Sequence, residues 1–211
     1  MRTPKAKTFG GVAPEAKTVP QVFIIESLRF SDERDARLEG KVLADVLKMC
    51  GKNPLYFYFR TEAELVVLAK KFHASGYRYL HISCHGSDDS IETTLDSIPY
   101  ARFAEVFANK LVNRRLFASA CEVGNELFSE EIGGLNKGMH SIAAPADAIR
   151  FDVAVAFWAA FYVKAFYINE SAMKAADITG VFRPLCALFD IRLHWSRYSA
   201  KHERWDHEVI D

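Results

Sequence analysis

The sequence predicts an α/β fold, in which a mostly parallel, doubly wound sheet of about six strands is flanked by helices. Three observations support this class. Short apolar runs alternate along the chain with longer segments of helical periodicity. The apolar runs are nearly continuous, as expected for strands that are covered on both faces. The chain has 211 residues, 50% of them hydrophobic, which is enough for one domain with a sizeable core.

The first two strands and the helix between them come from the first third of the chain. "QVFIIES" at 21–27 is rich in branched apolar residues and predicts a strand. A helix is expected over 31–51, where apolar residues recur at helical spacing and Ser31 or Asp32 is suited to cap the start. "PLYFYF" at 54–59 predicts the second strand.

The next helix has clear signals at both ends. Thr61 and Glu64 form a capping box, in which each side chain accepts a hydrogen bond from a free amide of the first turn. Gly76 is suited to end this helix, because glycine adopts the left-handed conformation of a C-terminal cap. "YRYLHIS" at 77–83 then predicts the third strand.

The second half of the chain continues the alternation. The helix expected at 150–166 is apolar, but it is short for a membrane span and carries Asp152 and Lys164, so we expect a buried core helix. The full set of expected elements is a helix at 98–112, strands at 114–120 and 139–145, the core helix at 150–166, a segment at 171–189 that Gly180 and Pro184 divide into helical pieces, and a last strand at 190–196.

The composition at the two ends sets the expected domain limits. Residues 1–20 are rich in Lys, Thr, Pro and Gly and predict a flexible N-terminal arm. The catalytic or binding domain is expected over 21–197. Residues 198–211 are polar and charged, which predicts a tail draped over the surface.

Charge and cysteine content exclude several classes of function. The 27 Lys and Arg residues balance the 27 Asp and Glu residues, whereas proteins that bind nucleic acid or anionic membranes usually carry a basic excess. We therefore expect neither as a partner. The four cysteines form no CxxC pair, and the first twenty residues lack the apolar core of a signal peptide. These features favour a cytoplasmic protein with free thiols.

Chemically active residues follow two of the predicted strands directly. His85 and Gly86 come after the strand at 77–83, and Cys121 comes after the strand at 114–120. In parallel sheets, reactions take place outside the carboxyl ends of the strands. If these two strands are neighbours, His85 can take the proton of the Cys121 thiol and later protonate a leaving amine. The amides of Gly86 and Cys121 are suited to stabilise the oxyanion that forms.

Other interpretations of these residues are weaker. A free cysteine is most often a small buried apolar residue, which is how we interpret Cys84, whose side chain should point away from that of His85. A zinc ion bound by His81, Cys84, His85 and Cys121 is disfavoured, because consecutive strand residues diverge. No glycine-rich phosphate loop follows the first strand, which argues against a flavodoxin-like phosphate binder. We expect no metal and no cofactor.

The two strand-end motifs resemble those of caspase-like cysteine peptidases. "YLHISCHG" is similar to their apolar strand that ends in His-Gly, and "RRLFASACEVGN" to their strand that ends in Ala-Cys-x-x-Gly. The form "SACEVG" is more similar to the CHAT branch, which is related to separase and found mainly in bacteria, than to animal caspases, and the likeness extends over about residues 75–166. The resemblance implies a caspase-like three-layer sandwich, peptide-bond hydrolysis, a His85–Cys121 dyad, and an oxyanion hole formed by the Gly86 and Cys121 amides.

Four further residues are candidates for the substrate pocket. Ser119 stands two residues before Cys121, where an Asp in related peptidases can select basic side chains, so this position does not support basic specificity. Asp88, Asp147 and Asp152 are expected on loops near the mouth of the site. Each of them also fits a solvated loop residue, and Asp152 stands where a helix N-cap belongs.

Together these features predict a cysteine endopeptidase that cleaves a protein substrate. The short chain shows no repeat domain of the kind that often accompanies CHAT peptidases, so we expect a separate protein partner or a loop change to regulate activity. The alternative is a catalytically silent caspase-like module that serves in interaction or regulation.

Overall fold

A seven-stranded sheet forms the centre of the protein. The computed structural model describes residues 18–199, 202 and 204–211. The strand order is β10-β9-β8-β7-β3-β1-β2. In chain order the strands are β1 (Val19–Glu26), β2 (Leu55–Tyr58), β3 (Tyr77–Ser83), β7 (Arg115–Ser119), β8 (Ser141–Pro145), β9 (Leu193–Ser199) and β10 (Arg204–Ile210).

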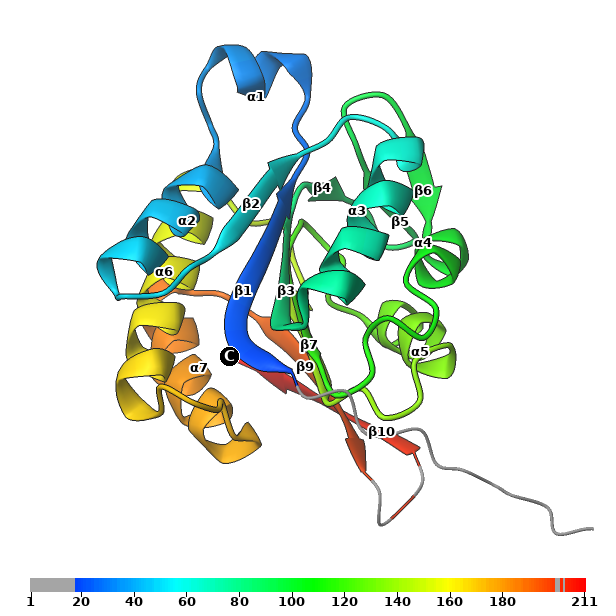
Figure 1. Cartoon of the computed structure of the whole chain (residues 1–211). Helices are drawn as coiled ribbons and strands as arrows, with labels where there is room; N and C mark the ends of the chain where they lie inside the picture. The colour runs from blue at the N-terminus through cyan, green and yellow to red at the C-terminus, as the bar shows by residue number, and fades with distance from the viewer. Residues whose placement is uncertain (1–17, 200–201, 203) are drawn as a thin grey trace, which may run out of the picture.

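Most of the sheet is parallel. β2, β1, β3, β7 and β8 pair in parallel with their neighbours, whereas β9 and β10 run antiparallel at one edge. The carboxyl ends of the parallel strands lie at the top in Figure 1. The predicted α/β class with a mostly parallel sheet is therefore confirmed, with one strand more than expected.

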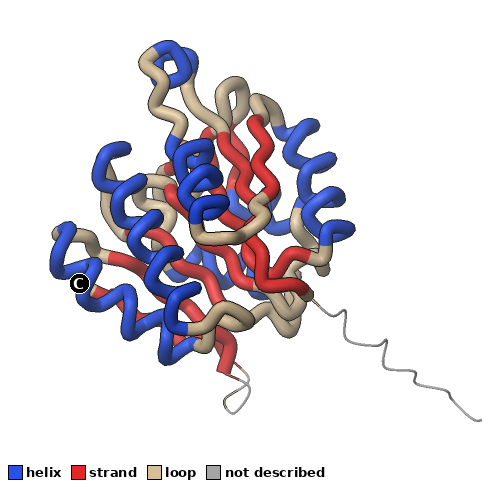
Figure 2. The backbone as a smooth tube through the Cα atoms, turned by 60° about the vertical axis from the view of Figure 1, so that its left-hand side comes forward, coloured by secondary structure: helices blue, strands red, loops and turns tan. Residues whose placement is uncertain are grey.

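Helices cover both faces of the sheet and complete three layers (Figures 1 and 2). On one face lie α2 (Glu39–Met49), α6 (Phe151–Ile168) and α7 (Ala175–Phe189), and on the other α3 (Glu62–Ser75), α4 (Tyr100–Val106) and α5 (Glu126–Gly134). The short helix α1 (Phe30–Arg34) stands above the carboxyl ends of the strands. Successive strand residues alternate between two cores: Leu80 and Ile82 join the α3–α5 core, and Tyr79 joins the α2–α6–α7 core.

Local sequence signals explain several element ends. The Thr61 capping box is present, with the Thr61 hydroxyl accepting from the Glu64 amide, and Gly76 ends α3 at a φ of 69°. α6 is long and apolar enough to cross a membrane by length and composition alone. Its Phe157, Trp158 and Phe161 side chains are fully buried in the α2–α6–α7 core, as expected for a core helix.

Two predicted helices have different limits. The expected helix at 31–51 is two helices, because the chain turns between α1 and α2 with Ala36 in the left-handed region at a φ of 55°. The segment at 171–189 forms the single helix α7, with Pro184 inside it. Burial of Phe182 and Cys186 against the sheet side of α7 offsets the hydrogen bond that Pro184 cannot make.

A second, small sheet follows β3 directly and was not predicted. It consists of β4 (His85–Gly86), β5 (Ser90–Glu92) and β6 (Ser97–Pro99), which pair antiparallel in that order. The helix expected at 98–112 corresponds to α4, which is shorter: it begins at Tyr100, after β6, and ends at Val106. The helix α5 was also not predicted.

The expected domain limits need correction at both ends. The prediction of a polar C-terminal tail over 198–211 is wrong, since β9 extends to Ser199 and Arg204–Ile210 form β10. The composition of this edge strand is polar, but Trp205 packs against the α3–α5 core and Ile210 is fully buried in the α2–α6–α7 core. At the other end, residues 1–17 of the expected arm lie outside the described residues, and Val19 and Pro20 already belong to β1.

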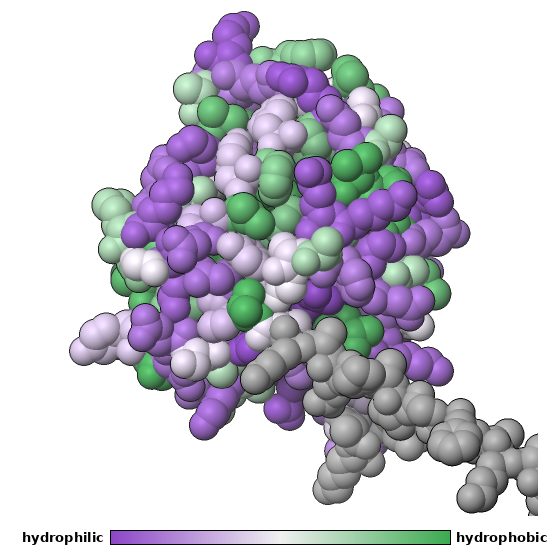
Figure 3. Space-filling model, in the orientation of Figure 1, coloured by the Kyte–Doolittle hydropathy of each residue, from purple (hydrophilic) through white to green (hydrophobic). Residues whose placement is uncertain are grey.

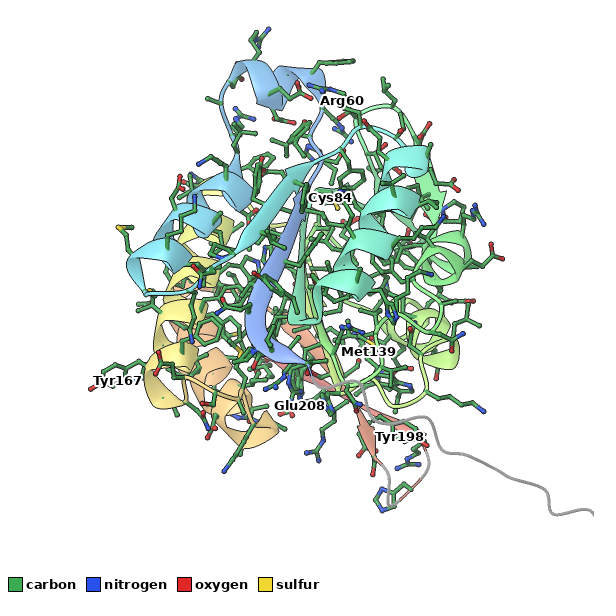
Figure 4. The ribbon with its side chains drawn as sticks, viewed as in Figure 1. Arg60, Cys84, Met139, Tyr167, Tyr198 and Glu208 are labelled. Atoms are coloured by element: carbon green, nitrogen blue, oxygen red, sulfur yellow. The ribbon has the colours of Figure 1, made fainter. Side chains whose placement is uncertain are left out.

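The surface is mixed in character. On the face shown in Figure 3, apolar residues are scattered between polar ones. Tyr167, near the end of α6, is 84% exposed and projects away from the protein in Figure 4.

Candidate active site

Strand pairing brings the two predicted motifs to the same edge of the sheet. β3 and β7 are direct neighbours, and Ser83 pairs with Ser119 at their ends. The pairing continues one step further, because the Cys84 amide donates to the Ser119 carbonyl over 3.1 Å. His85 and Cys121 therefore leave adjacent strands at equivalent heights.

His85 and Cys121 line one small cavity. Its volume is about 40 Å³, and Ile149 and Phe151 from the segment that enters α6 close its other side. Cys121 is half-buried. Its Sγ accepts a hydrogen bond from the Ile149 amide over 3.4 Å and lies 3.6 Å from the Ile149 carbonyl oxygen. The thiol is thus held inside this cavity next to a titratable imidazole.

His85 is oriented by a carboxylate that the sequence did not reveal as part of the site. His85 Nε2 lies 2.8 Å from Asp32 Oδ2, and Asp32 Oδ1 accepts from Arg37 over 2.9 Å. The Phe151 ring packs edge-on against the imidazole, with centroids 5.6 Å apart. Because Nε2 is engaged by Asp32, Nδ1 is the nitrogen that remains to act as a base.

Asp32 was expected only as a possible helix cap. It lies inside α1, is 5% exposed, and makes its main contact with a residue 53 positions later in the chain. A cap can be predicted from neighbouring residues, whereas this contact depends on how the β1–α1 connection crosses the top of the sheet. No local signal in the sequence indicates it.

Two glycines allow the backbone segments of the site to approach closely. A Cβ atom on Gly86 would lie 2.4 Å from Val123 Cγ2 and 3.1 Å from the Cys121 carbonyl oxygen. A Cβ atom on Gly124 would lie 2.3 Å from the Ala144 carbonyl oxygen, where the Gly124 amide donates to Pro145 at the end of β8. The glycines of both motifs are therefore required for packing the nucleophile loop between β4 and β8.

Cys84, Cys186 and His81 are buried, whereas Cys50 is half-buried at the end of α2, and Cys84 also lines the small cavity. Cys84 lies near the upper end of the central strands beside α3 (Figure 4), and burial raises the pKa of its thiol well above the usual range. Burial also raises the pKa of Cys186 to about 12. His81 is fully buried, with Nδ1 3.2 Å from the Tyr162 hydroxyl, but Nε2 has no hydrogen-bond partner among the described residues.

Of the four expected pocket residues, only Ser119 lies in the cavity. It is 3% exposed, and its hydroxyl donates to Glu39 Oε2 over 2.9 Å. Asp88 and Asp147 are exposed and do not line this cavity. They support the nucleophile loop through their backbones, since the Asp147 carbonyl accepts from the Glu122 amide and the Asp88 carbonyl from Asn125.

Asp152 also lies outside the small cavity. Arg150, not Asp152, is the N-cap residue of α6, so that expectation is wrong. The Asp152 side chain is exposed and pairs with Arg150 over 2.7 Å, which lowers the pKa of its carboxyl. It lines a larger adjoining groove of about 540 Å³ between the α1–α2 connection and α6.

A cluster of buried acids beneath the site was not foreseen either. Glu26 at the end of β1 accepts hydrogen bonds from the Gly40 and Lys41 amides at the start of α2 and from Tyr56. Burial raises the pKa of Glu26 to about 7. Glu39 lies next to it and accepts from Ser83 over 3.1 Å as well as from Ser119.

Among the described residues, no group of three or more His, Cys, Asp or Glu side chains could hold a metal ion. The chemistry that the described cavity itself offers is that of a thiol beside a carboxylate-bound imidazole.

Comparison with known proteins identifies the fold. No protein-family model matches the chain, and no curated protein matches its sequence. The structure is similar to a secreted C11 cysteine protease from Bacteroides thetaiotaomicron, "iotapain", with a TM-score of 0.52 and 11% identity over 85% of this chain and 67% of that chain. It is also similar to caspase-1 from Spodoptera frugiperda, with a TM-score of 0.52 and 15% identity over 89% of this chain and 84% of that one. The predicted caspase-like fold is therefore confirmed.

Proposed function

We propose that this protein is a cysteine endopeptidase that cleaves a protein substrate with Cys121 as nucleophile and His85 as general base. One observation carries the proposal: both side chains line the same cavity, while Asp32 engages Nε2 of the imidazole and leaves Nδ1 available. The structural neighbours with the same fold are cysteine proteases, which supports this class of reaction. At 11% and 15% identity, the assignment of the dyad depends on the geometry of this chain.

The reaction follows from these positions. His85 Nδ1 takes the thiol proton, and the Cys121 thiolate attacks the carbonyl carbon of the scissile peptide bond. In this proposal the Gly86 and Cys121 amides donate to the resulting oxyanion, and the close approach of the two backbone segments supports this assignment. The imidazolium then gives its proton to the leaving amine, and water hydrolyses the thioester that remains. Asp32 serves as a positioning residue that fixes the imidazole and balances its charge.

The size of the cavity supports control by a partner. The cavity beside Cys121 is small, about 40 Å³, and Ile149 and Phe151 line it, so we infer that a movement of these two residues widens it for the substrate. We infer that a regulatory protein stabilises this open state. The "SACEVG" motif supports placement in the CHAT branch, and with it a bacterial, cytoplasmic setting.

The experiment maps cleavage sites in a complex peptide library with wild type, Cys121→Ala and His85→Ala. Cleavages that disappear in both variants are expected. Cleavage that persists in both would refute the dyad. Labelling with thiol-reactive peptides provides a second measurement: selective modification of Cys121 over Cys50, Cys84 and Cys186 is expected of an enzyme, whereas slow and uniform labelling would instead indicate a catalytically silent module.

A further inference from the structure

The carboxylate of Glu39 joins the ends of the two strands that carry the dyad. Ser83 and Ser119 are the last residues of β3 and β7, and they pair with each other across the sheet. Both hydroxyls donate to the same oxygen of Glu39, Oε2, over 3.1 Å and 2.9 Å. None of the three residues is more than 5% exposed, so water competes little for these hydrogen bonds.

The two serines stand just before the reacting side chains. Ser83 lies two residues before His85, and Ser119 lies two residues before Cys121. A single acceptor for both hydroxyls fixes the height of one strand end relative to the other. Proton transfer within the dyad needs a separation of about 2.6–3.2 Å, and a misplacement of about 1 Å costs on the order of 100-fold in rate. The register of these two strand ends is therefore a requirement of the proposed reaction.

Glu39 is itself held from behind by buried side chains. Its other oxygen, Oε1, lies 3.8 Å from Nε2 of His81, which precedes Ser83 by two residues and so lies on the same face of the sheet. His81 Nδ1 in turn lies 3.2 Å from the Tyr162 hydroxyl, and the ring of Trp158 packs edge-on against the imidazole with centroids 5.2 Å apart. His81, Tyr162 and Trp158 are fully buried, so they leave the carboxylate little room to move.

The start of α2, which carries Glu39, is fixed to a third strand end. Glu26, the last residue of β1, accepts from the Gly40 amide over 2.8 Å and from the Lys41 amide over 3.3 Å. A Cβ atom on Gly40 would lie 3.3 Å from Glu26 Cβ, so this glycine allows the helix to approach β1 closely. Glu26 Oε1 also lies 3.4 Å from the Ser83 hydroxyl, a longer contact than that with Glu39. The ends of β1, β3 and β7 are therefore joined at one helix start.

We propose that Glu39 is a positioning residue, which holds the ends of β3 and β7 in register so that the His85 imidazole meets the Cys121 thiol. It acts through the Ser83 and Ser119 hydroxyls and takes no part in proton transfer or attack. This inference rests on the proposed peptidase function. It differs from a purely structural role, in which loss of these hydrogen bonds lowers the stability of the protein but leaves the reactivity of the folded site unchanged.

The test compares wild type with Ser83→Ala and Ser119→Ala, on protein that circular dichroism shows to be folded. The two measurements are kcat and KM on a cleaved peptide and, without turnover, the rate at which iodoacetamide alkylates Cys121. We expect each variant to lose roughly tenfold or more in kcat and in alkylation rate, because the imidazole no longer meets the thiol, while KM changes by less than about threefold.

Ser141→Ala is the matched control. Ser141 is a fully buried serine at the opposite end of the same sheet, and its hydroxyl accepts from Arg115 over 2.6 Å. Its replacement also removes a buried hydrogen bond, but one that does not reach the dyad. We expect both rates to change by less than about threefold in this variant.

Two variants of Glu39 test the shared acceptor. Glu39→Gln keeps an oxygen that accepts from both serines, so it should retain at least about a third of kcat, whereas Glu39→Ala should lose roughly tenfold or more. In the Glu39→Ala background, Ser119→Ala should cost less than about a further threefold, because its partner is already absent. A full tenfold further loss would show that Ser119 acts independently of Glu39 and would overturn the inference.

The outcomes separate this inference from the proposed function. Wild-type kcat and alkylation rates in both folded serine variants would refute the positioning role. A loss confined to KM would also refute it, because the effect would then lie in substrate binding. Absence of Cys121-dependent cleavage by wild type would instead refute the proposed function. If Glu39→Ala does not fold, the two serine variants decide the question alone.

Discussion

Replacement of Asp32 by asparagine tests how His85 is held. The change removes the negative charge that faces His85 Nε2 at 2.8 Å but keeps the size of the side chain. Asp32 is 5% exposed, so solvent screens this interaction little. Hydrogen bonds to charged groups contribute about 1.5–3 kcal/mol. An interaction of this size that strengthens as the imidazolium forms corresponds to a loss of about 10- to 150-fold in kcat/KM.

The loss should appear in catalysis and much less in stability. Arg37, the other partner of Asp32, is half exposed and keeps Asp35 at 3.7 Å, so it does not become a buried unpaired charge. We expect the free energy of unfolding of Asp32→Asn to fall by less than about 1 kcal/mol.

The assay measures kcat/KM on a cleaved peptide and, independently of turnover, the rate at which iodoacetamide alkylates Cys121. Asp35→Asn is the matched control, because Asp35 is an exposed acid of the same connection that pairs with Arg34 and Arg37. Equal activity of Asp32→Asn and wild type would refute the positioning role. An equal loss in Asp35→Asn would show that the general charge of the connection matters instead of the contact with His85.

Three further predictions concern the fold around the site. Gly124→Ala should lose roughly 2 kcal/mol or more in urea unfolding, because its Cβ would lie 2.3 Å from the Ala144 carbonyl oxygen. Gly180 lies within α7, and a Cβ there would have no atom within 4 Å, so Gly180→Ala should raise the free energy of unfolding by about 0.5–1 kcal/mol. A similar loss of stability in both glycine variants would contradict this account. Because the pKa of Glu26 is raised from 4.5 to about 7, the folded state binds the proton more tightly than the unfolded chain. The stability of wild type relative to Glu26→Gln should therefore fall, by up to about 3 kcal/mol, as pH rises through this range, and a flat difference between the two unfolding curves would contradict it. If β10 is part of the sheet, Ile210→Ala should lower the free energy of unfolding by about 2–4 kcal/mol, because Ile210 is fully buried. Val209 is 45% exposed, so Val209→Ala should lower it by less than about 0.5 kcal/mol. Near-neutral effects of both substitutions would indicate a loose tail.

Much of the fold was predictable because its signals are local. Continuous apolar runs indicated β1, β2, β3, β7 and β8, and the Thr61 capping box and Gly76 defined α3. β10 was missed because this edge strand carries mostly charged and polar residues and shows no continuous apolar run. The small sheet β4–β5–β6 was missed because its strands have only two or three residues each.

The sequence by itself determined that His85, Gly86 and Cys121 stand directly after two apolar strands, since strand periodicity and chain order fix which residues occupy strand ends. Only the tertiary structure decided which acids join them. Asp32 reaches His85 across 53 positions, and Glu39 reaches Ser119 across 80. Both contacts depend on the path of the connection from β1 to α2 over the edge of the sheet. No periodicity encodes that path, because it is fixed by long-range packing.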